Sequence, residues 1–419
     1  MIQIQGLKLP DWNALRREWR DADLLLFIFP LLLTIIGGIA IYSSDFSNRR
    51  TEWWQHWVTA CVGIGLSFSI ARTHYDRLLR LHWVTYALTN ISLILVLLIG
   101  TTALGAERWI TIGGFNIQPS EFAKVGVIIS LAALLHNTQI NTPLDMFKAA
   151  WITVPPWILI FKQPNLGTAL VFAAITLGML YWAGARASWL GLMISPVIAA
   201  VLFNVAIPAW IAWVVLMGVA AWISLPWFRV TATITAVAVN LVAGQIGTVL
   251  WNTLHDYQRR RLLLFLDPSQ DPLGGGYHLI QSQIAIGAGQ FWGEGWLNGT
   301  QTQLNFIPEQ HTDFIFSAVG EEFGFMGCMI LLLCFVGLCW RLLVVAVNAR
   351  DNFGSLLAIG VFSFVLFQTF VNIGMNIGTG PVTGIPLPWV SYGRSALLAN
   401  FMAIGLVESV AVHRRMIKF

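Results

Sequence analysis

The sequence predicts an all-α protein that spans a membrane many times. Of its 419 residues, 57% are hydrophobic and only 11% are charged, and the mean hydropathy is +0.70. Because soluble domains carry about 25% charged residues, this composition excludes an ordinary soluble protein. One bilayer-spanning helix takes about 20 apolar residues. We therefore expect a single transmembrane domain over residues 24–412, between a cytoplasmic segment 1–23 and a cytoplasmic tail 413–419.

Twelve apolar stretches are long enough to be candidate spans. They cover residues 24–42, 53–71, 79–101, 121–135, 147–161, 166–183, 188–205, 207–225, 230–251, 325–347, 354–378 and 395–412. The first stretch is too long for the apolar region of a signal peptide and has no clear cleavage site, so we interpret it as a retained anchor. The four cysteines all lie within apolar stretches, which favours a packing role over disulfides or metal binding.

The basic residues predict that both termini lie in the cytoplasm. With that orientation, most arginines and lysines fall in inner loops and in the C-terminal tail, as the positive-inside rule requires. The net charge of +4 thus reflects topology and does not indicate a nucleic-acid partner. One basic cluster, Arg259–Arg261, falls on the outer side. Either one span is miscounted, or these arginines have a function there.

One outer connection, residues 252–313, is far longer than the others. Loops of this length in compact proteins are usually functional or disordered. Its glycine-punctuated apolar stretch, Tyr277–Trp296, indicates structure that lies on the bilayer surface or dips into it. Tryptophans near span ends, Trp389 among them, are interpreted as anchors in the headgroup layer. We therefore expect the chemistry on the outer face.

Ionisable residues gather at the outer ends of the predicted spans, where the cost of burying charge makes each one a candidate functional group. Ser120 is a suitable N-cap, and Glu121 and Lys124 share one helix face. A structural ion pair explains these two as well as a functional pair does. Glu321 and Glu322 begin a long apolar stretch, where a favourable interaction with the helix dipole favours a structural role.

The candidate catalytic carboxylate is Asp313, which stands where the polar loop meets an apolar helix. Partial burial at such a junction suits a general base. A helix cap is the alternative interpretation of this aspartate. His311 lies two residues away, but the sequence supplies no further partners for a metal site or a Ser/His/Asp set. The proline-rich segment Pro381–Ser395 is either a structural plug or a rigid wall for a groove.

Five strings, in order along the chain, resemble the SEDS family (shape, elongation, division and sporulation), the integral-membrane peptidoglycan glycosyltransferases. They are GAERWITIGGFNIQPSEFAK, QPNLGTALVF, DPLGGGYHLIQSQIAIGAG, GWLNGTQTQLNFIPEQHTDFIFSAVGEEFG and VNIGMNIGTGPVTGIPLPWVSYGRSA. Within the family, GWLNGTQTQLNFIPE is similar to the RodA-type elongation enzymes rather than to the FtsW-type division enzymes. The resemblance implies a core of ten spans, to which a hairpin at 207–251 is added.

The resemblance implies an enzyme of cell elongation and shape that polymerises lipid II at the outer face of the bacterial cytoplasmic membrane. Asp313 then takes the proton from the acceptor sugar's 4-hydroxyl, while the growing glycan loses its undecaprenyl diphosphate. Cations must offset the charge of that leaving group. The candidate substrate-binding residues are Trp109, Arg108, Glu121, Lys124, Arg259, Arg261, His311, Glu321 and Ser391.

The implied partners are lipid II, the undecaprenyl diphosphate-linked glycan, a class B penicillin-binding protein that crosslinks the strands, and membrane proteins of the elongation complex. The sequence shows no set of protein ligands for a metal. A divalent ion, Mg or Mn, shared with the diphosphate would need few such ligands and stays open. No other cofactor is expected.

Two positions depart from the family pattern: Asn165 stands where members usually have aspartate, and Arg394 stands where they have glycine. Two other functions stay open. A translocator (flippase) of lipid-linked cell-wall precursors would also need polar groups in its spans, and a non-catalytic scaffold would only activate the transpeptidase. Because the polar groups cluster at one end of the spans, the sequence favours the enzyme.

Overall fold

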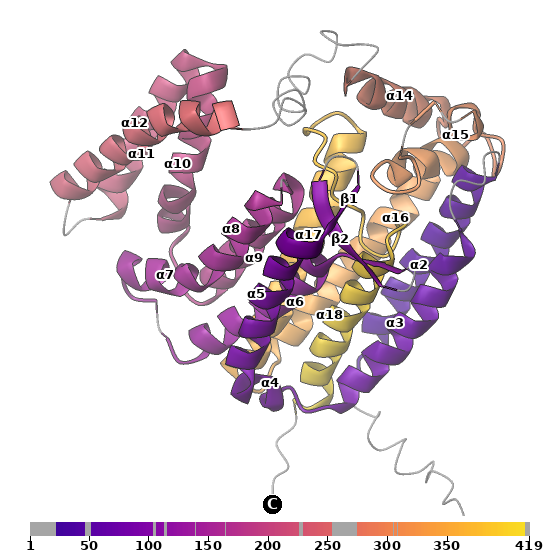
Figure 1. Ribbon diagram of the computed structural model, residues 1–419, viewed down its shortest axis with the longest axis horizontal. Coiled ribbons are helices and arrows are strands. Elements are labelled where there is room, and N and C mark those ends of the chain that lie inside the picture. Colours follow the sequence, from indigo (N-terminus) through magenta and orange to yellow (C-terminus); the bar gives the residue numbers. More distant parts are fainter. Residues whose placement is uncertain are drawn as a thin grey trace, which may run out of the picture.

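A computed structural model describes residues 22–46, 52–103, 106–112, 115–138, 140–163, 165–225, 229–253, 275–304, 306–307 and 309–414. These residues form a bundle of helices with one small sheet (Figure 1). The predicted all-α polytopic fold is therefore confirmed.

Each predicted span coincides with a helix, or, at 147–161, with a pair of short helices. The helices are α2 (Leu24–Asp45), α3 (Trp54–Arg72), α4 (Asp76–Arg80), α5 (His82–Ile99), α6 (Pro119–His136), α7 (Pro143–Ala150), α8 (Val154–Lys162), α9 (Leu166–Trp182), α10 (Ala187–Val205), α11 (Ile207–Ser224), α12 (Arg229–Thr253), α14 (Gly275–Ala288), α15 (Thr300–Gln303), α16 (Ile315–Val347), α17 (Asn352–Asn376) and α18 (Arg394–Val412).

Ten helical segments of this described part are long and apolar enough to cross a membrane. Two predicted spans are not among them. Helix α9 has 17 residues and is slightly short, and α3 is less apolar because Gln55, His56 and Ser67 lie within it. Both still pack lengthwise within the bundle, α9 against α17 and α3 against α18.

The bundle has two distinct ends. Asp23, before α2, donates its backbone N–H to the Glu408 carboxylate near the end of α18 at 2.7 Å, so both described chain ends meet at what we name the inner end. Helices α14 and α15 lie at the opposite, outer end (Figure 1). The long loop is thus on the side opposite the termini, as the predicted topology requires.

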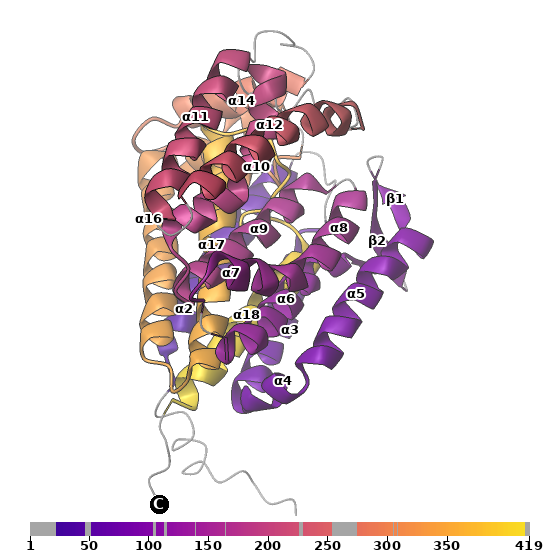
Figure 2. The same ribbon diagram turned by 90° about the vertical axis from the view of Figure 1, so that its left-hand side faces the viewer.

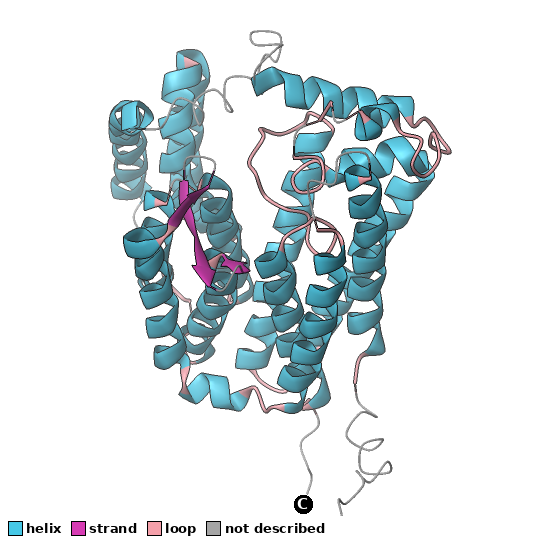
Figure 3. Cartoon of the chain, turned by 45° about the vertical axis from the view of Figure 1, so that its right-hand side comes forward, coloured by secondary structure: helices cyan, strands magenta, loops and turns pink. Residues whose placement is uncertain are grey.

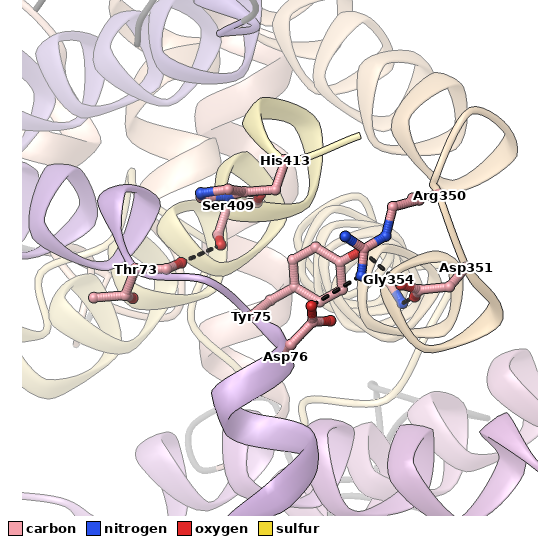
Figure 4. A network of polar contacts seen from close by, with 8 residues as sticks. All are labelled: Thr73, Tyr75, Asp76, Arg350, Asp351, Gly354, Ser409 and His413. Carbon is pink, nitrogen blue, oxygen red and sulfur yellow. Dashed lines mark hydrogen bonds and ion pairs between the residues drawn. The ribbon is translucent and has the colours of Figure 1, made fainter. Parts of the chain in front are cut away.

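Polar contacts close the inner end between α3, α17 and α18 (Figure 4). Arg350 contacts Asp76 at 2.8 Å, and the Tyr75 hydroxyl donates to Asp351 at 2.8 Å. The pKa of the Tyr75 phenol is raised, chiefly by burial and secondly by the hydrogen bond to Asp351. The Ser409 hydroxyl donates to the Thr73 carbonyl at 2.5 Å. These contacts tie the loop between α3 and α4 to the ends of the two most C-terminal spans.

A small antiparallel sheet connects α5 to α6 (magenta in Figure 3). Its strands are β1 (Thr101–Ala103), β2 (Ala106–Ile112) and β3 (Phe115–Ile117), in the order β1-β2-β3. The sequence analysis did not predict this sheet. The alternation of isoleucine and threonine at residues 110–112 is a strand pattern, but it is too short to stand out beside the long apolar helices.

Helices α10, α11 and α12 pack chiefly on one another and touch the remaining bundle mainly through α9. They lie to one side of the other spans in Figure 1 and in front of them in Figure 2, where that side faces the viewer. The hairpin expected at 207–251 corresponds to α11 and α12. Its status as an addition to a ten-span core stays a prediction.

Small residues allow the central spans to approach closely, as is common between helices in membranes. Helices α6, α17 and α18 are the most buried of the ten candidate spans in the described residues. A Cβ added at Gly405 in α18 would lie 2.6 Å from the Ser67 carbonyl oxygen of α3, and one at Gly360 in α17 would lie 2.5 Å from Ile128 of α6. Larger side chains at these positions would force the helices apart.

Gly405→Leu is therefore expected to lower the free energy of unfolding by about 1–3 kcal/mol, as overpacking does in well-packed cores. Thermal unfolding of the purified protein measures this effect. Gly65→Leu is the matched control, because a Cβ there meets nothing within 4 Å. Equal loss of stability in both variants would contradict the close-packing interpretation.

Candidate functional site at the outer end

Asp313 lies in a turn that ends directly before α16, as predicted. The backbone N–H groups of Thr312 and Asp313 donate to the Glu309 carbonyl at 3.1 and 3.2 Å, and Glu309 adopts a positive φ of 53°. The N-cap of α16 is Phe314, and no side-chain hydrogen bond caps the helix there. This geometry is against the alternative interpretation of Asp313 as a helix cap, and the residue is half-buried.

Two asparagines of α17 fix the backbone of Asp313. The Nδ2 groups of Asn372 and Asn376 donate to the Asp313 carbonyl oxygen at 2.9 and 3.0 Å. Asn376 also accepts from the Ser317 N–H at 3.2 Å, and both asparagines are fully buried. The sequence analysis missed them, although two asparagines four residues apart on one face of an apolar helix are a usable signal.

The proline-rich segment holds the same turn from another side. The Ser391 hydroxyl donates to the Thr312 carbonyl at 2.6 Å and accepts from the Leu387 N–H at 2.8 Å. The Tyr392 N–H donates to the His311 carbonyl at 2.9 Å. The structure thus brings Ser391 and His311 together with Asp313. We name Pro381–Ser395 the wall segment; whether it is a plug or the wall of a groove stays open.

Glu321 holds the loop that precedes Asp313. This fully buried carboxylate accepts from the backbone N–H groups of Gln301 and Thr302 at 2.7 and 2.8 Å, and from the Thr302 hydroxyl at 2.5 Å. Its neighbour Glu322 accepts from Ser43 of α2. This supports the structural role favoured for both glutamates, and substrate binding by Glu321 stays a prediction.

Glu121 and Lys124 form a buried ion pair in the first turns of α6. Their N–O distance is 2.7 Å, and the side chains are 4% and 2% exposed. The Lys124 ammonium also lies 5.3 Å from the centre of the Phe364 ring. Removing one partner of such a pair leaves an uncompensated buried charge, which costs about 3–5 kcal/mol. The pair therefore has a structural role, whatever its part in substrate binding.

The start of α18 links α6 to the wall segment. The Gln118 N–H, directly before α6, donates to the Ser395 hydroxyl at 2.9 Å. Trp109 lies half-buried in β2, close in sequence to this junction. Arg394, the first residue of α18, is also half-buried there. The predicted site residues Glu121, Lys124 and Ser391 thus belong to one connected region at the outer end.

The remaining predictions concern cations and metals. Arg259 and Arg261 lie outside the described residues, and so does the side chain of Arg108. Among the described residues, no group of three or more His, Cys, Asp or Glu side chains could hold a metal ion. Of the candidate cations for the diphosphate, Lys124 and Arg394 are the two whose side chains lie within the described residues.

Asn165 is the N-cap of α9, where its side-chain oxygen accepts from the Thr168 N–H at 3.3 Å. Asparagine and aspartate cap helices equally well. The departure from the family's aspartate therefore keeps the cap and removes one charge.

These features define a class: a polytopic helical membrane protein with a carboxylate held at the outer end of its bundle. A family model described as "Cell cycle protein", FtsW/RodA/SpoVE, matches residues 23–217 and 206–416. The chain therefore belongs to this family, and the resemblance to SEDS proteins is confirmed. The two matches meet within α11, inside the stretch expected to be added.

Similar proteins and a solved structure are consistent with this family. Peptidoglycan glycosyltransferase MrdB of Escherichia coli K12 is 38% identical over 95% of both chains. Peptidoglycan glycosyltransferase RodA of Treponema pallidum is 36% identical over 93% of this chain and 97% of its own. A chain from the structure "Structural coordination of polymerization and crosslinking by a peptidoglycan synthase complex" matches with a TM-score of 0.71 and 28% identity, over 94% of this chain and 98% of that one.

Asn376→Ala is expected to lower activity by tenfold or more while the protein still folds, because the turn with Asp313 loses one of its two α17 donors and Ser317 loses its acceptor. Glycan formation by the reconstituted protein measures this. Ser363→Ala is the matched control, since its hydroxyl bonds only within α17, to the Ile359 carbonyl at 2.8 Å. Unchanged activity in Asn376→Ala would show that the α17 asparagines do not position the turn.

Asn165→Ala is expected to cost about 0.5–2 kcal/mol of stability through loss of the cap, as measured by thermal unfolding. Asn165→Asp keeps an acceptor and should remain close to the parent. A loss in Asn165→Asp as large as that in Asn165→Ala would mean that the amide nitrogen, rather than the cap, is what this position requires.

Proposed function

We propose that this peptidoglycan glycosyltransferase polymerises lipid II at the outer face of the cytoplasmic membrane, with Asp313 as its general base. The observation that carries the proposal is the position of Asp313, half-buried at the outer end and held through its backbone by Asn372, Asn376 and the turn at Glu309. These backbone contacts give residue 313 a fixed position, which supports its assignment as the base. The activity named for relatives over nearly the full chain supports the assignment.

The reaction needs one base and one site for a leaving anion. The Asp313 carboxylate takes the proton of the acceptor's 4-hydroxyl as that oxygen attacks the anomeric carbon of the growing glycan. The bond from this carbon to the lipid diphosphate breaks, and its electron pair leaves with the diphosphate. Because this is a single displacement, the configuration at the carbon inverts.

Cations must stabilise the departing diphosphate. We assign this role to Arg108, Arg259, Arg261 and Arg394, since guanidinium groups bind phosphate oxygens in bidentate fashion. Lys124 is assigned to it as well, as a point charge whose buried pair with Glu121 must open toward the diphosphate. A Mg or Mn ion shared with the diphosphate belongs to the proposal as well, since it would need few protein ligands. Trp109 and His311 are further residues that we assign to substrate binding.

The partner and the orientation are part of the proposal. The structural match to a peptidoglycan synthase complex supports a class B penicillin-binding protein as the crosslinking partner. Other membrane proteins of the elongation complex would join the same assembly. The inner end, where the described chain ends meet, is assigned to the cytoplasm, so the Asp313 turn faces the cell wall.

Asp313→Asn is expected to lower the rate of lipid II polymerisation by at least about 100-fold, the lower end of what a general base usually contributes, without loss of stability. The donors from α17 reach the backbone oxygen of residue 313, so the substitution leaves them in place. Glycan strands formed from lipid II in vesicles are the measurement. Glu294→Gln, an exposed carboxylate of the same outer loop, is the matched control.

Assays in the same vesicles distinguish the proposed enzyme from a flippase and from a scaffold. A flippase would move labelled lipid II across the bilayer, would form no glycan, and would be insensitive to Asp313→Asn. A scaffold would support synthesis by its partner equally well with either residue at 313. Full polymerisation by purified Asp313→Asn would contradict the proposed base.

A further inference from the structure

The turn that follows α14 carries exposed aromatic side chains. Phe291 is 50% exposed and Trp292 is 76% exposed. Phe325 of α16, against which the turn packs, is 53% exposed. We name residues 290–293 the aromatic turn.

A break in α16 fixes the aromatic turn in place. Gly324 has φ 64° and ψ −162°, so the helix is interrupted there. The freed Phe325 and Met326 N–H groups donate to the carbonyls of Gln290 and Phe291 at 2.9 and 3.2 Å. In return, the N–H groups of residues 294 and 295 donate to the carbonyls of residues 321 and 322 at 2.9 and 3.1 Å. The turn therefore replaces the missing helical hydrogen bonds and cannot slide along α16.

The break also determines where the aromatic turn lies along the membrane normal. At 1.5 Å per residue, the helix from 325 to 347 is about 34 Å long, which suffices for the hydrocarbon thickness of about 30 Å. Along this part, the apolar side chains of Ile330, Leu333, Val336 and Trp340 are all more than half exposed, as expected of a lipid-facing surface. Phe325 stands at its outer end, and the Phe291 ring stacks on Phe325 with centres 5.8 Å apart.

Other aromatic side chains lie at the same level. Trp296 contacts Tyr42 at the end of α2, with ring centres 5.9 Å apart, and Tyr42 contacts Trp53 before α3 at 5.1 Å. These residues stand at the outer ends of two spans. Aromatic rings concentrate at the membrane–water interface because their amphipathic character suits the headgroup layer. The aromatic turn thus adds to the aromatic residues that the span ends place at the membrane–water interface.

We propose that the aromatic turn is a membrane anchor, in which Phe291 and Trp292 insert into the headgroup layer of the outer leaflet. The turn leads directly into the loop held by Glu321, which leads to Asp313. The anchor therefore fixes the height of the outer loop relative to the lipid surface. Its ligand is the outer leaflet of the bilayer.

The test measures the depth of position 292 in the full chain. Trp292→Cys carries a bimane fluorophore in a chain whose four native cysteines are replaced and which still polymerises lipid II. The labelled protein is placed in vesicles of phosphatidylethanolamine and phosphatidylglycerol. Separate vesicle sets carry a nitroxide quencher at the lipid headgroup, near the acyl carbonyl, or near the terminal methyl.

The expected result is at least twofold stronger quenching by the two shallow nitroxides than by the deep one. Leu333→Cys, in the middle of the lipid-facing surface, should show the reverse order. Asn298→Cys, an exposed polar position of the same loop, should be quenched little by any of them. Quenching at 292 as weak as at 298 would overturn the proposal. So would shielding of the label that appears only when a class B penicillin-binding protein is added.

Discussion

The outer end of this protein depends on the need of buried backbone groups for hydrogen-bond partners. The turn at Asp313 and the proline-rich segment run between helices, where water cannot serve every carbonyl. Side chains serve them instead: Asn372 and Asn376 of α17 reach the Asp313 carbonyl, and Ser391 of the wall segment reaches that of Thr312. A loop bound in this way behaves like part of the bundle. A half-buried side chain carried by such a loop, as that of Asp313 is, can then be held in a fixed position.

Four regions of the chain meet through these contacts. The Asp313 turn, the end of α17, the wall segment and the junction before α6 are joined by direct hydrogen bonds. The buried Glu121–Lys124 pair follows directly in α6. Because each link joins a different helix, the arrangement of the site and the packing of the spans support each other. This is a reason for polar residues, costly in a membrane, to be retained at this end.

Much of this could be predicted from the sequence, because long apolar stretches determine helices in a membrane, and Asp313 stands visibly at a loop–helix junction. What escaped prediction depends on tertiary contacts. Asn372 and Asn376 have meaning only once α17 lies beside the turn. The glycine at 324 does favour a break from the sequence alone, but the aromatic turn that supplies its backbone partners could not be predicted. Trp389 was expected to anchor in the headgroups, but it is 1% exposed with a positive φ of 61°, because the wall segment folds inward over the bundle.

The self-contained packing of α10, α11 and α12 has a consequence for how such proteins change over time. These three helices pack on one another and contact the other spans mainly through α9. Such a unit can be gained or lost without repacking the rest of the bundle. Its sequence is then under little constraint from the reaction centre. Such a unit can acquire new contacts with neighbours in the membrane without disturbing the rest of the bundle.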